Sequence, residues 1–281
     1  MINKNTISEY LHSMALAKFI YSINKTLPYD KLDSFINNIK DVIKFNGKTY
    51  HLLETLFPDD KFVKFVSCSE TGLDALITVS EIEKTIFITF RGTEMETIDA
   101  YYNINLTKKY LTDDIFVHKG YWDHLTKYNL HLTMCKIISK LLDKYPNYKV
   151  NIAGHSLGSM LSTLFCYILI TQMPCLNGKI SVNMFAPPCA CNNKMFTFLK
   201  SKNITISSFI YKNDFVSSLF PGFDEYFPKY VLSNNFFYYL TNKNDGTLES
   251  HRDDFGNSRI DDHNSKHYLN SILAIYKKYY D

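Results

Sequence analysis

One serine in the sequence has neighbours that suit nucleophilic catalysis. The segment Gly154 to Gly158 reads Gly-His-Ser-Leu-Gly, follows a β-branched stretch ending at Ala153 and precedes an apolar helical segment starting near Ser159. At so sharp a strand-to-helix turn, glycines at both flanking positions prevent collisions, and the turn lifts the serine hydroxyl into solvent. The backbone N–H of Leu157 then faces the place where an oxyanion would form. We predict that Ser156 is a nucleophile; the alternative is a glycine-rich turn without catalysis.

A serine hydroxyl needs a histidine base, which in turn needs a carboxylate to orient it. Behind such an elbow the chain order is Ser, then Asp or Glu, then His. Only His251, His263 and His267 follow Ser156. Asp214 directly follows the strand-like residues 206–211, which places its carboxylate at the end of a strand. We therefore expect Asp214 to be the third member, with Asp224 as the alternative.

Strands and helices alternate along the sequence. A helix with one buried face is predicted from Met134 to Tyr145, before Pro146, and a second from Tyr268 to Tyr276. The short β-branched or aromatic stretches that predict strands are 76–79, 85–90, 148–153, 180–185 and 206–211. This order predicts an α/β fold with a mostly parallel central sheet, helices on both faces and catalytic groups at the strands' C-terminal ends.

Composition narrows the class of protein. The 281 residues are 46% hydrophobic and 21% charged, which is typical of a globular protein. The net charge is +3, from 31 basic and 28 acidic residues, with no basic block longer than two lysines, so nucleic acid is excluded as an expected partner. No repeat or linker divides the chain. We expect a single domain over residues 1–281, in which residues 1–70 form a mainly helical N-terminal part.

The sequence has no pattern typical of a secretion signal, a membrane-spanning helix, a disulfide scaffold or a metal site, and we predict location and cofactors from this. The N-terminal segment has early charges and helically spaced apolar residues, unlike a conventional secretion signal. The longest apolar run elsewhere, Met160 to Ile170, is shorter than the roughly 20 residues that span a bilayer. Six cysteines are too sparse for a disulfide scaffold, which favours a reducing, cytoplasmic location. No His, Cys, Asp or Glu spacing indicates a metal, and no cofactor is expected.

Four segments together resemble one family, the class 3 lipases, which include fungal triacylglycerol lipases and related acylglycerol hydrolases. The segments span roughly residues 75 to 275, and they read Phe90-Arg91-Gly92-Thr93, Val117-His118-Lys119-Gly120-Tyr121, Gly154 to Gly158, and Asp262-His263-Asn264 with Tyr268 following. The resemblance implies an α/β-hydrolase fold. It also implies serine-dependent hydrolysis of lipid acyl esters, such as triacylglycerol or another acylglycerol, through an acyl-enzyme.

The resemblance also assigns residues. Thr93 would supply the second half of the oxyanion hole, opposite Leu157. Asp214 matches the aspartate of the family's Asp-Pro-Val, with Phe215 in place of the proline. His263 would be the base, and His267, one helical turn further on, is the alternative.

Two histidines are expected to be structural. His155 would point away from the nucleophile, and His118 would be a buried histidine with satisfied hydrogen bonds.

Two departures weaken any inference about the substrate. Ser159-Met160 stands where the family has Gly-Ala, and Phe185 to Cys189 lacks the family's arginine. The alternatives are a catalytically silent module that binds lipid or protein, or a phospholipase, thioesterase or peptidase on the same fold. We also expect transient contact with a lipid or membrane surface. Residues 94–106 would act as an amphipathic lid, and residues 220–227 would form the opposite wall of the entrance.

Overall fold

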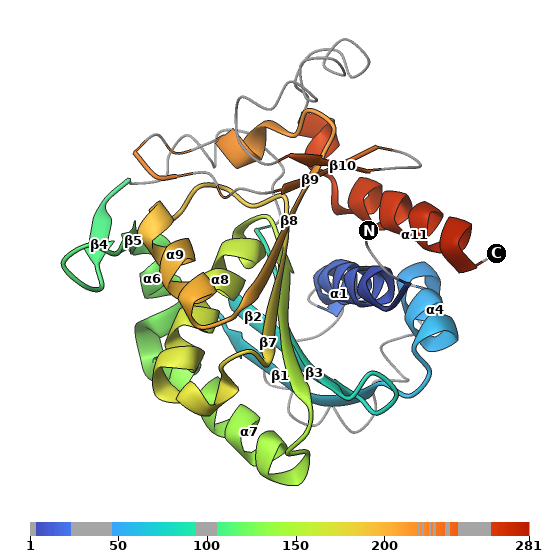
Figure 1. Ribbon diagram of the computed structural model, residues 1–281, viewed down its shortest axis with the longest axis horizontal. Coiled ribbons are helices and arrows are strands. Elements are labelled where there is room, and N and C mark those ends of the chain that lie inside the picture. Colours follow the sequence, from blue (N-terminus) through green and yellow to red (C-terminus); the bar gives the residue numbers. More distant parts are fainter. Residues whose placement is uncertain are drawn as a thin grey trace.

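A central eight-stranded sheet organises the chain (Figure 1). The computed structural model describes residues 4–23, 47–93, 106–218, 220, 222–224, 226, 229–233, 237–240 and 260–280. The strands are, in spatial order, β1 (Lys61–Cys68), β2 (Leu73–Ser80), β3 (Thr85–Phe90), β6 (Lys149–His155), β7 (Ile180–Phe185), β8 (Thr205–Tyr211), β9 (Lys229–Leu232) and β10 (Phe237–Leu240).

The middle of this sheet is parallel and its edges are antiparallel. Strands β3, β6, β7, β8 and β9 run in one direction, and β1, β2 and β10 pair antiparallel to their neighbours. The five predicted strands are all present, and the predicted mostly parallel sheet is confirmed. The carboxyl ends of the parallel strands meet at one edge, where catalytic groups are expected in such sheets.

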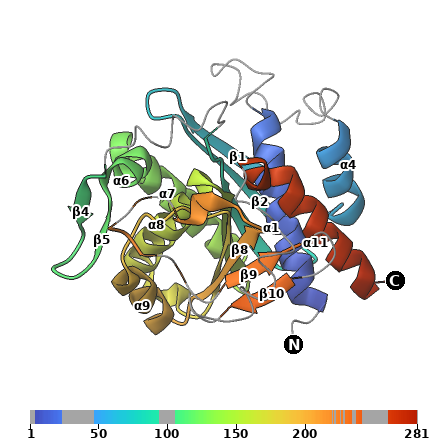
Figure 2. The ribbon, with the colours of Figure 1, turned by 90° about the horizontal axis from the view of Figure 1, so that it is seen from above.

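Helices cover both faces of the sheet, as predicted (Figures 1 and 2). The first face is covered by α6 (Lys119–Thr126), α7 (Leu130–Lys144), α8 (Leu157–Gln172) and α9 (Asn193–Ser201). The second is covered by α1 (Lys4–Ile23), α4 (Gly47–Leu56) and α11 (Ser265–Tyr280). Each face has its own apolar core, because side chains alternate along a strand: Ile86 and Ile88 belong to the first core and Phe87 to the second. A small hairpin, β4 (Lys108–Tyr110) with β5 (Phe116–His118), lies outside the sheet.

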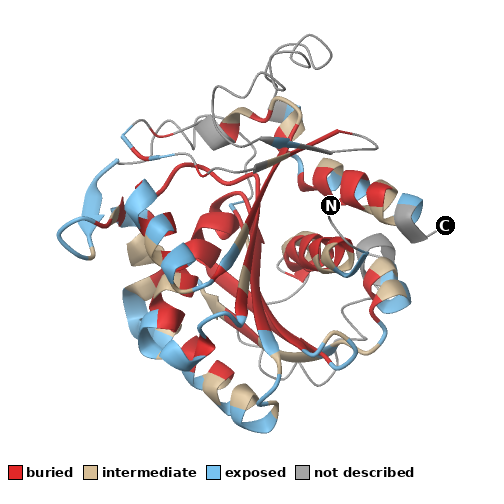
Figure 3. Ribbon diagram, viewed as in Figure 1, coloured by how far each residue is buried: buried red, intermediate tan, exposed pale blue. Residues whose placement is uncertain are grey.

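Helix α1 is enclosed on most sides, between the sheet, α4 and α11 (Figure 3). Part of its contact with the sheet is polar. Ser13 donates a hydrogen bond to Oδ1 of Asn151 on β6 at 2.9 Å and accepts one from Nδ2 of Asn183 on β7 at 3.0 Å. The hydroxyls of Tyr10 and Ser207 on β8 are 2.9 Å apart. These bonds fix α1 against three neighbouring strands, β6, β7 and β8.

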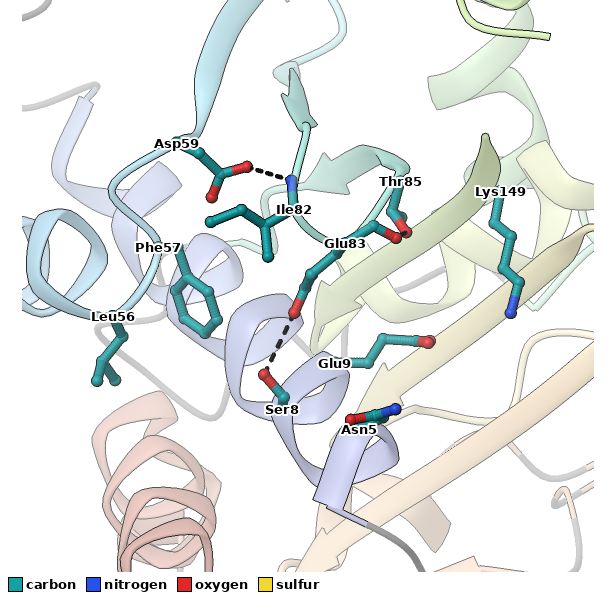
Figure 4. Close-up of a pocket in the computed structure, with 10 residues that line it drawn as sticks. All are labelled: Asn5, Ser8, Glu9, Leu56, Phe57, Asp59, Ile82, Glu83, Thr85 and Lys149. Carbon is teal, nitrogen blue, oxygen red and sulfur yellow. Dashed lines mark hydrogen bonds between the residues drawn. The ribbon is translucent and has the colours of Figure 1, made fainter. Parts of the chain in front are cut away.

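The opposite edge of the sheet contains a pocket of about 410 Å³ (Figure 4). Thr85 and Lys149, the first residues of β3 and β6, line it, so it lies at the amino ends of the strands. Glu83 accepts a hydrogen bond there from Ser8 at 3.2 Å. Its other oxygen lies 2.8 Å from Nδ1 of His12, a fully buried histidine whose Nε2 lies 2.6 Å from Asp60. This buried ion cluster joins α1 to the β2–β3 turn.

Within the part of the chain that the structure describes, no helix is both long enough and apolar enough to cross a membrane. The prediction of a single domain over residues 1–281, with a mainly helical part over residues 1–70, stays a prediction.

Candidate active site

Ser156 occupies the turn between β6 and α8. Strand β6 ends at His155 and α8 begins at Leu157, so the serine alone joins the two elements. Its φ of 59° and ψ of −129° lie outside the regions that non-glycine residues usually adopt. Such strain persists only where the surroundings determine it, and it is frequent at active sites. One restraint is the hydrogen bond from the backbone N–H of Ser156 to the carbonyl of Phe185 on β7, at 2.9 Å.

The two flanking glycines are required by close backbone contacts. A Cβ on Gly154 would lie 2.3 Å from the carbonyl carbon and oxygen of Gly158. A Cβ on Gly158 would lie 2.3 Å from the carbonyl oxygen of Phe90, the last residue of β3. Both distances are far shorter than any real Cβ contact. The missing side chains therefore allow the end of β3 to lie directly against the elbow.

Three predicted residues meet in a hydrogen-bonded chain. Nε2 of His263 lies 2.9 Å from Oγ of Ser156, and Nδ1 of His263 lies 2.8 Å from Oδ2 of Asp214. An ionised carboxylate only accepts hydrogen bonds, so Nδ1 carries the proton, and Nε2 is left to accept the proton of the serine hydroxyl. His263 ends a short 3₁₀ helix, Ile260–His263, just before α11. Asp214 follows the end of β8, as its sequence position predicts.

The carboxylate of Asp214 is held from several directions. The side chain of Asp214 is buried, and its Oδ1 accepts a hydrogen bond from the N–H of Val216 at 3.0 Å. Its Oδ2 accepts a second bond from the hydroxyl of Tyr268, at 2.6 Å. Burial, and then the nearby Asp214 charge, raise the pKa of Tyr268 well above its usual value, so this hydroxyl remains a donor. The sequence resemblance included Tyr268 but gave it no role.

The two predicted oxyanion donors come from elements that meet at the elbow. Leu157 opens α8, where a backbone N–H has no partner within the helix and lies at the positive end of the helix dipole. Thr93 is exposed and lies just past the end of β3. The segment from the end of β3 to Thr93 is anchored by Arg91, whose guanidinium forms an ion pair with the buried Asp74 at 2.7 Å. The roles of Thr93 and Leu157 stay predictions.

The expected exposure of the nucleophile is wrong. Ser156 is only 1% exposed, although the turn was expected to lift its hydroxyl into solvent. Two neighbours contribute to this burial. The ring of His263 lies against Oγ, and Gly92 approaches so closely that a Cβ on it would be 3.1 Å from Cβ of Ser156. The hydroxyl of Ser156 therefore faces neighbouring protein groups and has little contact with solvent.

The alternative site residues lie elsewhere or outside the described residues. The ring of His267 stacks on Tyr211, with centroids 5.1 Å apart and planes at 9°. Asp224 accepts a hydrogen bond from the N–H of Asn193 at 2.7 Å. His251 and the predicted lid, apart from Leu106, lie outside the described part of the chain.

His118 is buried as expected, but its hydrogen bonds are not all satisfied, because Nε2 has no partner among the described residues. Its Nδ1 accepts a hydrogen bond from the N–H of Tyr121 at 3.3 Å and so caps α6. Burial lowers the pKa of His118, which favours the neutral acceptor form. Phe220 and Phe223, from the segment expected to line the entrance, are buried beside this ring.

The described residues contain no group of three or more His, Cys, Asp or Glu side chains that could hold a metal ion. The groups that the structure brings together around Ser156 are a hydroxyl, an imidazole and a carboxylate. That set of groups can activate an oxygen nucleophile.

Comparisons with solved structures show the fold. A Rhizomucor miehei triacylglyceride lipase superposes with a TM-score of 0.73 at 19% identity, covering 98% of this chain and 98% of that one. Lipase II from Rhizopus niveus gives a TM-score of 0.67 at 19% identity over 82% of each chain. A triacylglycerol lipase described as having a serine protease triad gives 0.74 at 19% identity, covering 98% of both chains. The predicted α/β-hydrolase fold is confirmed.

Sequence comparisons also find lipases. The lipases of Rhizopus niveus and Rhizopus oryzae are each 25% identical to this chain over 178 residues, which is 58% of this chain and 42% of theirs. The match therefore spans less than half the length of these curated relatives. The family model described as Lipase (class 3) matches residues 87–223, from β3 past Asp214. The central part of the chain is thus similar to the class 3 lipases.

Proposed function

We propose that this protein hydrolyses carboxylic esters of lipids through an acyl-enzyme formed on Ser156. The observation that carries the proposal is the continuous hydrogen-bonded chain from Ser156 through His263 to Asp214. The strained backbone of Ser156 supports the proposal independently. A positive φ at a serine is unfavourable, and such strain is concentrated at active sites.

The proposed reaction has two stages. Oγ of Ser156 attacks the ester carbonyl carbon while Nε2 of His263 accepts the hydroxyl proton, and the carbonyl oxygen becomes an oxyanion between the N–H groups of Leu157 and Thr93. The C–O bond to the alcohol then breaks, and His263 returns the proton to the leaving alcohol. In the second stage, water gives a proton to His263 and attacks the acyl carbon. The bond from that carbon to Oγ of Ser156 breaks, His263 returns the proton to Oγ, and the carboxylic acid is released. Asp214 stays ionised and stabilises the imidazolium in both stages.

The proposed substrate is an acylglycerol, with triacylglycerol as the first candidate. Its support is the match of residues 87–223 to the class 3 lipase model, together with relatives and structural neighbours that are named lipases or triacylglycerol lipases. The same site would also serve a phospholipase or a thioesterase, because the elbow does not specify the leaving group. Lipid esters aggregate in water, so we include transient contact with a lipid surface in the proposal.

The test is hydrolysis of a panel of lipid esters by the purified protein and by Ser156→Ala. We expect acid release from a tributyrin emulsion that the variant lacks. Faster release from a phospholipid vesicle or an acyl thioester would transfer the assignment to that class. A wild-type protein that releases no acid from any member of the panel, at a rate above the variant, would contradict the proposal and leave a silent module.

A further inference from the structure

Helix α1 contacts the catalytic edge through Tyr21. Its hydroxyl lies 3.1 Å from Nδ1 of His155, the residue before the nucleophile and 134 positions away in the chain. A Cβ on Gly92 would lie 2.3 Å from that hydroxyl oxygen and 2.4 Å from the carbonyl oxygen of His155. The tyrosine hydroxyl therefore fills the narrow space between the oxyanion segment and the elbow, and only glycine leaves that space open.

The ring of His155 is packed against the catalytic histidine. The centroids of His155 and His263 are 4.9 Å apart with planes at 37°, and Tyr268 lies edge-on to His155 at 5.4 Å. His155 is 4% exposed. His263 is thus confined on a side that neither Asp214 nor Ser156 occupies. From the sequence, His155 is expected to be structural, and no local pattern assigns a role to Tyr21.

We propose that Tyr21 and His155 form a positioning pair, in which the Tyr21 hydroxyl fixes the His155 ring and that ring keeps the imidazole of His263 in line with Ser156. The proposal deepens the function proposed above and rests on it, because it assigns His263 the role of base. Neither residue touches the reacting atoms. Each would act through the geometry of His263, for which displacements of an ångström are costly.

The pair also suits the charge that appears during the reaction. His263 becomes an imidazolium, and a second positive ring beside it would oppose that change. Burial, and then the nearby charges of His263 and Lys18, hold the pKa of His155 well below its usual value, while the backbone of His263 has a smaller opposite effect. The other facing groups, Tyr21 and Tyr268, are phenols and carry no charge at neutral pH. A neutral His155 can therefore support His263 without repelling its charged form.

The matched test compares two tyrosines on α1. Tyr21→Phe removes the hydroxyl bonded to His155 in a part-buried contact, and Tyr10→Phe removes a buried hydroxyl contact with Ser207 on β8. We expect Tyr21→Phe to lower kcat roughly tenfold with KM changed less than about twofold, because positioning acts on the chemical step. Tyr10→Phe should keep both constants near wild type. His155→Phe should match Tyr21→Phe, and the double variant should lose no more than either single one.

A second readout needs no lipid substrate. The rate at which a fluorophosphonate probe labels Ser156 reports activation of the nucleophile, and the ¹⁵N-imidazole spectrum reports the tautomer of each ring. Tyr21→Phe should slow labelling by about the same factor as kcat and shift the His155 signals. If the wild-type protein reacts with the probe but hydrolyses no lipid ester, the proposed substrate is wrong. The labelling rates of the variants would still show whether Tyr21 and His155 position His263. Equal labelling rates for Tyr21→Phe and Tyr10→Phe, or an unchanged spectrum, would overturn the positioning pair, even if His155→Phe fails to fold.

Discussion

The hydroxyl of Tyr268 donates a 2.6 Å hydrogen bond to Oδ2 of Asp214, the same oxygen that faces Nδ1 of His263. The hydroxyl also accepts a bond from the N–H of Tyr211 at 2.9 Å, so its position is fixed from both sides. Helix α11 thereby links its own packing to the orientation of the carboxylate. A hydrogen bond to an ionised group is stronger than one between neutral groups, so this contact bears on both stability and rate.

Removal of this hydroxyl tests the link. Tyr268→Phe should lower the free energy of unfolding by about 2 kcal/mol, because a buried bond to a charged acceptor is lost. It should also reduce kcat roughly tenfold at unchanged KM, since Asp214 can turn away from His263. Urea unfolding and steady-state kinetics measure the two effects. Tyr226→Phe, which loses a hydroxyl bond to the carbonyl of Ile206, is the control for stability alone. A drop in kcat as large as that of Tyr268→Phe in the control would refute the link.

The activities of the His263 and His267 variants show which of these two histidines is the base. His263→Ala and Asp214→Asn should each cost roughly 10⁴-fold in kcat, the scale seen when one member of such a unit is removed. His267→Ala should be mild, because that ring stacks on Tyr211 outside the hydrogen-bonded chain. Activity on a soluble ester measures all three. The reverse order of the two histidine variants would move the base to His267.

The close contact at Gly158 is a packing requirement. Gly158→Ala places a Cβ 2.3 Å from the carbonyl oxygen of Phe90, so β3 has to move away from the elbow. We expect a loss of about 1–3 kcal/mol in unfolding free energy, typical of overpacking, together with strongly reduced probe labelling of Ser156. Gly178→Ala is the contrasting variant. Its new Cβ would contact only a side-chain atom, at 3.8 Å, so any loss of stability would come from the backbone strain of an alanine at a φ of +72°. Full labelling of Gly158→Ala would show that the contact is not needed.

The buried His12 cluster predicts an unusual pH dependence of stability. Burial lowers the pKa of His12, but its bonds to Asp60 and Glu83 raise it more, to about 9 from 6.5. The folded pKa is the higher one, so this stabilisation is complete below pH 6.5 and is lost as the pH rises towards 9. The loss should be at most about 3 kcal/mol, and less if Asp60, whose pKa burial raises, shares the proton.

Unfolding free energies between pH 6 and pH 9 test that slope. The variant His12→Gln should be less stable than wild type at pH 6 and should lack the decline. Because the cluster lies at the opposite edge of the sheet, probe labelling of Ser156 at pH 7 should stay close to wild type wherever the variant is folded. A wild-type stability that is flat or rising over this range would contradict the assignment of a charged His12.

Local sequence patterns predicted the parts of the fold that local forces determine. β3 and β7 match their predicted bounds because nearly all the side chains in these two short strands are buried. The edge strand β1 was missed, since Lys61 and Lys64 interrupt its apolar pattern and its side chains are mostly half-buried. The short strands β4, β5, β9 and β10 gave too few residues for a period to be seen.

The site shows the same division between local and long-range information. Ser156, Asp214 and His263 could be proposed because chain order and short motifs carry them. The contacts of Tyr21 with His155 and of Tyr268 with Asp214 join positions 134 and 54 residues apart, and no local pattern encodes such a pairing. Burial of Ser156 was missed for the same reason, since it depends on Gly92 and His263, which come from distant segments.

Direct detection of the acyl-enzyme tests the central proposal most sharply. The purified protein would be mixed with p-nitrophenyl butyrate, quenched in acid within the first turnover, digested and analysed by mass spectrometry. In the wild-type protein we predict a butyryl group on the peptide that contains Ser156. In Asp214→Asn and His263→Ala this group should accumulate only slowly, and in Ser156→Ala it should be absent. A butyryl group on another residue, or ester hydrolysis by Ser156→Ala at the wild-type rate, would contradict the account.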